Sequence, residues 1–236
     1  MRLADTVALI RLSARVVGGR RYWLAPLLPL IWPAFHAVRL WQGWRDEGAF
    51  EPVDVQVFLI GLPLTVLAIA LGGRVIAGEV DRRTLEIAYT VPGGAHRVWL
   101  AKLAATTLIL IAAELLMAGL VWLLLTSYPP WTLYGTLQGA LFYLVLAMAF
   151  AALCKNEITG AMVTVAFLVL NAFLTGFGGN QSRLSPFFNP LTLDNVNPSD
   201  VLAWTVQNRL GFVLAIAAVM ALAFSRAQRR EKMLGG

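Results

Sequence analysis

The sequence contains one cysteine, Cys154, and only two histidines, His36 and His96. A single cysteine excludes an internal disulfide and a cysteine-cluster metal site, so we expect it to pack as a small apolar residue. The two histidines stand apart and belong to no HExxH motif. We therefore expect no bound metal in this chain.

Motifs for nucleotide binding and for catalysis are also missing. The chain has no GxxxxGK[ST] phosphate loop, so any ATP that drives it must be bound by another chain. It has no GxSxG serine motif and no paired aspartates within its apolar segments, which argues against an intramembrane enzyme. The sequence thus predicts a chain that is not itself an enzyme and carries no cofactor of its own.

Charged residues are scarce. They make up 14% of the chain, against about 25% in ordinary soluble domains, while 58% of the residues are hydrophobic. This composition predicts an integral membrane protein. The net charge of +6 would also suit nucleic acid, but the placement of the charges indicates a membrane topology instead, and we expect no nucleic-acid partner.

Six segments are long and apolar enough to cross a bilayer, which takes about 20 mostly apolar residues. We therefore predict an all-α integral membrane protein with a six-span bundle over residues 22–225, in one transmembrane domain covering 1–236. The first segment contains Pro26, Pro29 and Pro33, so we expect it to be bent. The predicted spans are Tyr22–Trp41, Val55–Gly73, Leu100–Thr126, Trp131–Leu153, Thr159–Phe177 and Trp204–Ser225.

Lysine and arginine gather on one side of these predicted spans. Fifteen lie in the N-terminal segment, the second and fourth loops and the tail, whereas only four lie on the other side. The positive-inside rule then places both termini in the cytoplasm, with residues 226–236 as a basic tail. The acidic run Arg45–Asp54 falls outside, and the expected location is the inner (plasma) membrane.

The first 21 residues predict a helix that lies in the membrane interface. Its apolar positions follow helical spacing, while Arg11 and Arg15 share another face, as in helices that lie along a bilayer surface. Its role is either to anchor the topology or to contact a cytoplasmic partner. The segment carries arginines throughout and does not resemble a cleavable signal peptide. The apolar positions are Leu3, Val7, Ile10, Ala14 and Val17.

A dense group of charges stands between the second and third spans. On a helix over residues 79–91, the pairs Glu79–Arg83 and Arg82–Glu86 lie one turn apart with opposite signs. An apolar stripe forms the other face, and Pro92 begins a helix-breaking Pro-Gly-Gly run. Lys102 follows in the third span, where its long side chain is expected to reach the interface. Spacing alone leaves two interpretations: a functional cytoplasmic helix, or a solvated turn whose charges hold the topology.

This region resembles the loop between the second and third spans of ABC-2-type transporter permeases. The matching positions are Glu79, the run RTLE (Arg83–Glu86), Pro92 and Lys102, with Arg83 where the family commonly has glycine. The segment LSPFFNPLTL (Leu184–Leu193) resembles the Ser-Pro-Phe segment before the last span of that family. The six-span plan fits as well, so the resemblance covers almost the whole chain.

The resemblance implies a permease subunit of an ABC exporter. Its partners would be two copies of an ATPase subunit, which bind ATP and Mg, and a second permease subunit, identical or different. It also implies re-entrant outer helices between the fifth and sixth spans. The segment between spans two and three would be the coupling helix that contacts the ATPase. Its contact residues would be Glu79, Arg82, Arg83, Thr84, Leu85, Glu86 and Pro92.

Four residues are candidates for a substrate pathway. Glu114 stands near the middle of the third span, where a carboxylate is costly, so it either serves transport or holds helices together by hydrogen bonds. Asn171 in the fifth span favours helix contacts. Phe187 and Phe188 are expected to dip into the bilayer edge. The apolar, aromatic spans favour an amphiphilic substrate such as a drug, lipid or peptide. The alternative functions are a membrane anchor or scaffold for a cytoplasmic complex and, less favoured, an intramembrane enzyme.

Overall fold

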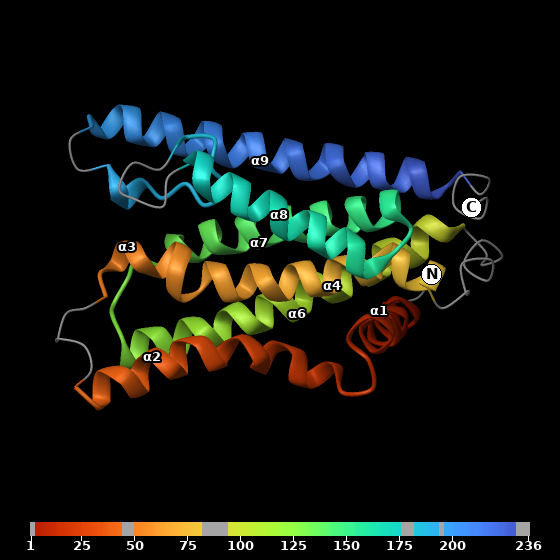
Figure 1. The fold of residues 1–236 in the computed structure, drawn as a ribbon, viewed down its shortest axis with the longest axis horizontal. Helices are drawn as coiled ribbons and strands as arrows, with labels where there is room; N and C mark the ends of the chain where they lie inside the picture. Colours follow the sequence, from red (N-terminus) through yellow and green to blue (C-terminus); the bar gives the residue numbers. More distant parts are fainter. Residues whose placement is uncertain (1–2, 44–49, 82–93, 176–181, 194–195, 230–236) are drawn as a thin grey trace.

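The computed structural model describes residues 3–43, 50–81, 94–175, 182–193 and 196–229. These residues are almost entirely helical and contain no strand, which confirms the predicted all-α class (Figure 1). The elements in chain order are α1 (Leu3–Gly18), η1 (Tyr22–Leu30), α2 (Ile31–Trp41), α3 (Pro52–Asp54), η2 (Val55–Leu59), α4 (Gly61–Asp81), α6 (Ala95–Leu124), α7 (Trp131–Cys154), α8 (Glu157–Thr175), η3 (Pro190–Thr192) and α9 (Pro198–Ala227).

Six helical segments of the described chain are long and apolar enough to cross a membrane, as the sequence predicts. The first, Tyr22–Trp41, has the predicted bounds, and most of the others extend beyond them. Proline explains the form of the first segment, since Pro26 and Pro29 lie inside a 3-10 helix, η1, that continues into the α-helix α2. The other five segments are Pro52–Asp81, Ala95–Leu124, Trp131–Cys154, Glu157–Thr175 and Pro198–Ala227.

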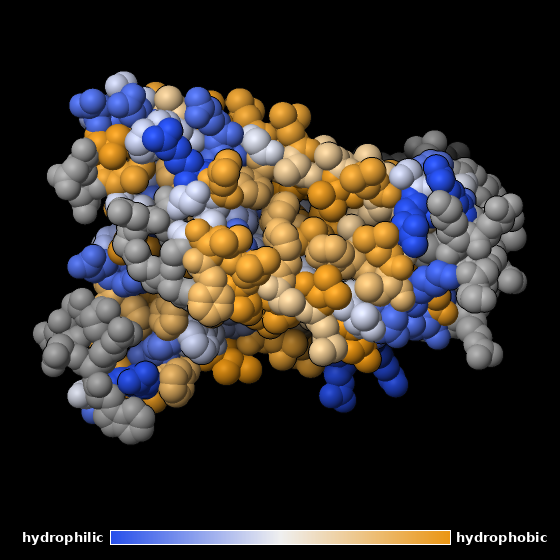
Figure 2. All heavy atoms as spheres, turned by 45° about the horizontal axis from the view of Figure 1, so that its top comes forward, coloured by the Kyte–Doolittle hydropathy of each residue, from blue (hydrophilic) through white to orange (hydrophobic). Residues whose placement is uncertain are grey.

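The helices α4 and α7 form the centre of the bundle. The most apolar windows of Pro52–Asp81 and Trp131–Cys154 are 67% and 61% buried, whereas those of α8 and α9 are only 11% buried. Glycines allow the central helices to approach closely, because a Cβ at Gly72 of α4 would lie 2.4 Å from the backbone oxygen of Leu144 in α7. Figure 2 shows that the exposed side chains form an apolar belt between two polar ends, as a lipid-facing surface requires.

The helix α1 lies across one end of the bundle instead of along it (Figure 1). Ala14 and Val17 are buried and Ile10 is partly buried against the core, while Arg11 and Arg15 are exposed. The predicted division between an apolar and a basic face therefore holds for these residues. Val7 is 58% exposed and does not join the core that Ala14 and Val17 enter.

The segment between α8 and α9 is a loop in its described part, and the re-entrant helices that the resemblance implies do not occur among these residues. Within residues 182–193 and 196–197 only η3, three residues long, is helical. The loop is fixed at the end of the bundle by side chains from other helices, which supply the hydrogen bonds that a helix would otherwise make internally.

Candidate functional site

A buried ion pair joins the end of α4 to the beginning of α6. The Lys102 ammonium donates hydrogen bonds to Glu79 Oε1 at 2.5 Å and to the Val75 carbonyl at 3.3 Å. Trp99 Nε1 donates to the other carboxylate oxygen, Glu79 Oε2, at 3.1 Å. The exposed fractions of Glu79, Lys102 and Trp99 are 7%, 2% and 0%. All three side chains are therefore part of the packed interior.

This arrangement corrects the sequence-based placement of two residues. Lys102 does not extend to the interface as predicted, because Glu79 provides a counter-charge inside the bundle, and paired charges are tolerated where single ones are costly. Glu79 lies in the last turn of α4 and is buried, so it is not part of an exposed charged face. The Trp99 ring also contacts Phe224 of α9, with ring centroids 5.7 Å apart, so the cluster joins three helices.

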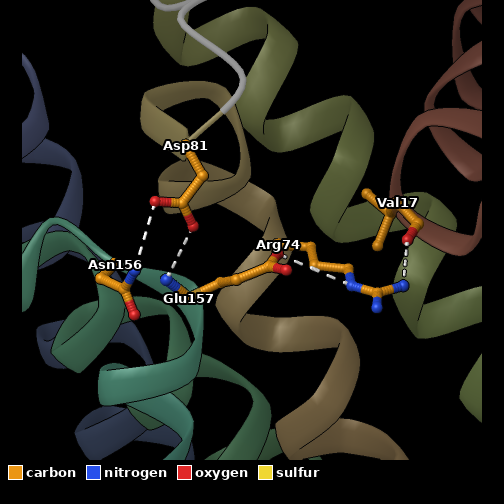
Figure 3. Close-up of polar contacts among 5 residues, drawn as sticks. All are labelled: Val17, Arg74, Asp81, Asn156 and Glu157. Atoms are coloured by element: carbon orange, nitrogen blue, oxygen red, sulfur yellow. Dashed lines mark hydrogen bonds and ion pairs between the residues drawn. The ribbon is translucent and has the colours of Figure 1, made fainter.

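A second polar network lies at the same end of the bundle (Figure 3). Arg74 of α4 donates to the Val17 carbonyl of α1 at 3.2 Å and pairs with the Glu157 carboxylate of α8 at 3.7 Å. Asp81, at the end of α4, accepts hydrogen bonds from the Glu157 backbone amide at 3.0 Å and from Asn156 Nδ2 at 3.4 Å. Through these contacts α4 is connected to both α1 and α8.

The start of α8 explains why Asp81 belongs there. Asn156 is the N-cap residue, and its Oδ1 accepts from the Thr159 backbone amide at 2.8 Å. The Asp81 carboxylate adds a negative charge at the positive end of the α8 dipole. The α4 helix therefore continues past the predicted end of its apolar run because its polar residues find partners on neighbouring helices.

Six of the seven predicted ATPase-contact residues lie outside the described residues. The described chain stops at Asp81 and resumes at Gly94, so only Glu79 of that set has a place in the structure. The first network above includes residues on both sides of this gap, and the second includes Asp81, directly before it. The remaining predictions concern Arg82, Arg83, Thr84, Leu85, Glu86 and Pro92.

Glu114 is buried between α6 and α7, with 4% of its surface exposed. It shares a short hydrogen bond with the Thr136 hydroxyl of α7, and that hydroxyl also lies 2.7 Å from the Leu133 carbonyl. The hydroxyl has one proton, which it can donate to the Glu114 carboxyl group or to the Leu133 carbonyl. This geometry favours the role of an interhelical hydrogen-bonding group over that of a pathway residue.

We expect Glu114→Gln to preserve the fold, because the amide of glutamine keeps both donor and acceptor atoms at this position. Its thermal stability in detergent should stay within about 0.5 kcal/mol of the parent chain, whereas Glu114→Leu should cost about 1 kcal/mol by loss of the hydrogen bond. Thermal melts of both variants measure this difference. A folded Gln variant with altered transport, or altered pH dependence of transport, would instead assign Glu114 to the pathway.

Phe187 and Phe188 are inserted into the bundle, which contradicts their predicted place at the bilayer edge. Their exposed fractions are 8% and 0%. The Phe187 ring stacks on Tyr143 of α7, with centroids 5.8 Å apart, and occupies space beside Gly139, where a Cβ would lie 2.6 Å from the ring. The space beside Gly139 lets the Phe187 ring pack more closely in the protein interior than it would in lipid.

Three amide side chains hold this loop, and the sequence reasoning did not find them. Gln56 Nε2 donates to the carbonyls of Phe187 and Phe188 at 3.1 and 2.9 Å. Asn208 Nδ2 donates to the carbonyls of Arg183 and Ser185 at 2.7 and 2.9 Å, and Asn189 Nδ2 donates to Val53 at 3.2 Å. For Gln56 and Asn208 the signal in the sequence was a polar residue within an apolar span, which marks buried hydrogen bonding, whereas Asn189 lies in the loop itself.

Asn171, the last of the pathway candidates, is half-buried on α8, and its backbone carbonyl accepts a hydrogen bond from Thr175. Asn171 and Phe187 both neighbour Tyr143 of α7, whereas the Glu114 carboxylate contacts Thr136. In the part of the chain that the structure describes, no group of three or more metal-ligating side chains converges.

The fold and these clusters define an all-helical, multi-pass membrane protein with anchored polar networks at one end and a packed loop at the other. Comparisons with protein families, with curated proteins and with solved structures find no match to this chain. Its function must therefore be argued from its own residues.

Proposed function

We propose that this chain is the permease subunit of an ABC-type transporter that exports an amphiphilic substrate. It works with two copies of a separate ATPase subunit and with a second permease subunit. The observation that carries the proposal is the anchoring of both ends of segment 82–93. Glu79 and Asp81 at its start, and Trp99 and Lys102 shortly after its end, are bonded into the bundle.

This anchoring suits a segment that receives force from outside the membrane. If a segment is joined to its helices only by flexible loops, a force on it moves the segment and leaves the helices in place. Here, displacement of residues 82–93 acts on α4 and α6 directly, on α1 and α8 through Arg74 and Asp81, and on α9 through Trp99. Packed helices respond as rigid bodies, so a stroke at this segment can rearrange several spans together.

The alternative function is a membrane scaffold that uses the same segment only for docking. A scaffold has no need of a loop packed into the far end of the bundle by Gln56 and Asn208, a feature that suits a closed pathway. This difference favours the transporter.

The function is tested by purifying the chain, with its partners, from its own cells. We expect an ATP-binding subunit to co-purify, and the complex in vesicles to move a fluorescent amphiphile only with hydrolysable ATP. Movement that is equal with a non-hydrolysable ATP analogue would contradict the proposal. Co-purification without any movement of amphiphiles would favour the scaffold.

The proposed orientation places both termini and Cys154 in the cytoplasm. Cys154 is the only thiol and is exposed, so an impermeant thiol reagent should label the native chain only after the cells are permeabilised. In a Cys154→Ser background, a cysteine at Ser127, which is exposed in the α6–α7 connection at the other end, should be labelled in intact cells. The reverse pattern would invert the topology and remove segment 82–93 from the cytoplasm.

A further inference from the structure

An apolar groove lies between the C-terminal parts of α7 and α9. Figure 1 shows the course of these two helices. The volume of the groove is about 410 Å³, and its walls are almost wholly aliphatic and aromatic until the last turn of α9. There the lining changes abruptly to basic residues. Phe150 and Leu153 of α7 line one wall, and Val219 and Leu222 of α9 line the other. Arg226 and Arg229 line the mouth.

The two arginines at the mouth are placed to receive an anion. Arg226 lies in the last turn of α9, and Arg229 lies just beyond the end of that helix, where its backbone amide donates to the Arg226 carbonyl at 3.1 Å. Both residues line the groove. The Nε atom of Arg226 is buried and has no hydrogen-bond partner among the residues that the structure describes. Leaving a buried donor of a charged group unsatisfied is costly, whereas an oxyanion between the two guanidinium groups would accept from both.

The apolar walls select among anions. A free phosphate or a carboxylate metabolite would gain nothing from the Phe150, Leu153 and Leu222 side chains, and would leave the groove empty. From Val219 to Arg226 the groove follows about 10 Å of helix, a length suited to part of an acyl chain. A basic pocket between transmembrane helices at headgroup level is a recurrent form of anionic lipid site.

We propose that this groove binds an anionic phospholipid of the surrounding bilayer. One acyl chain lies along Phe150 and Leu222, and the headgroup phosphate lies between Arg226 and Arg229. The site is separate from segment 82–93 and needs neither ATP nor a partner subunit. The lipid-binding proposal can therefore be tested independently of the transport function.

The test uses the full chain purified in neutral detergent, with phosphatidylglycerol and phosphatidylcholine of matched acyl chains as the two probes. Native mass spectrometry counts the lipid retained over a range of lipid concentrations. We expect the parent chain to retain phosphatidylglycerol in preference to phosphatidylcholine. The Arg226→Ala, Arg229→Ala variant should bind phosphatidylglycerol at least about tenfold more weakly, as expected for the loss of two charge-assisted contacts.

A matched variant separates the site from general electrostatic attraction. Arg20→Ala, Arg21→Ala also removes two exposed arginines that line no described groove, and it should keep binding within about twofold of the parent. A second groove variant, Ala149→Phe, narrows the apolar wall and should also lower retention. Equal retention of the two lipids, equal losses in both arginine variants, or displacement of the lipid by inorganic phosphate would each overturn the proposal.

Discussion

Replacing Glu79 by leucine should lower the stability of the purified chain by about 3–5 kcal/mol, because it removes the carboxylate that pairs with the buried Lys102 ammonium. Lys102 is 2% exposed, and it also donates to the Val75 carbonyl. Trp99 loses the acceptor of its indole N–H in the same variant. Unfolding in a denaturing detergent, followed by circular dichroism, measures this loss.

A double variant shows whether the charge pair is the cause. Glu79→Leu, Lys102→Met removes both charges and keeps similar side-chain volumes, so it should recover most of the lost stability, as replaced buried ion pairs do in other proteins. As a control for the loss of a carboxylate, Asp200→Asn on the exposed first turn of α9 should change stability by about 0.5 kcal/mol or less. If the double variant is no more stable than Glu79→Leu, the pair is not what holds α4 to α6.

Reversing two charges in segment 82–93 should separate the chain from its ATPase. The proposed contact places Arg82 and Arg83 against the partner, so Arg82→Glu, Arg83→Glu sets like charges against each other, at a cost of several kcal/mol. Binding would then weaken by orders of magnitude. The spans should still insert, since 13 of the 15 lysines and arginines assigned to the cytoplasmic side remain.

The expected phenotype is a chain that is present in the membrane but has lost its ATPase subunit or its substrate-stimulated hydrolysis. Membrane level, co-purification and hydrolysis are measured together. The matched control, Arg20→Glu, Arg21→Glu, makes the same change of charge at two exposed residues after α1 and should leave all three values near those of the parent. Equal losses in both variants would indicate a general effect of charge and not a contact.

The spans were predictable because hydropathy over about 20 residues is a property of the local sequence. Whether a single polar residue is buried could not be predicted, because its burial depends on partners far away in the chain. Lys102 was expected to reach water, and only the position of Glu79, 23 residues earlier, shows why it is buried.

The loop before α9 also depends on partners that are far away in the sequence. Phe187 and Phe188 look like bilayer-facing residues until Gln56, more than 130 residues earlier, is found to hold their carbonyls. Gly139 was unremarkable in the sequence, yet its missing side chain makes room for the Phe187 ring. Polar residues inside apolar spans were the one sequence signal for these buried hydrogen bonds. They indicate that a partner exists but do not identify it.

Site-specific crosslinking tests the proposed contact between segment 82–93 and an ATP-binding protein. A photoreactive amino acid at position 84 of the full chain is activated in membranes of the source cells, with the same group at Ser127 as the control from the other end of the bundle. We predict a crosslink from position 84, and none from position 127, to a protein that carries a phosphate-binding loop. Crosslinks from position 84 to lipid alone, in membranes where the chain is folded and abundant, would contradict the proposed contact with an ATPase subunit.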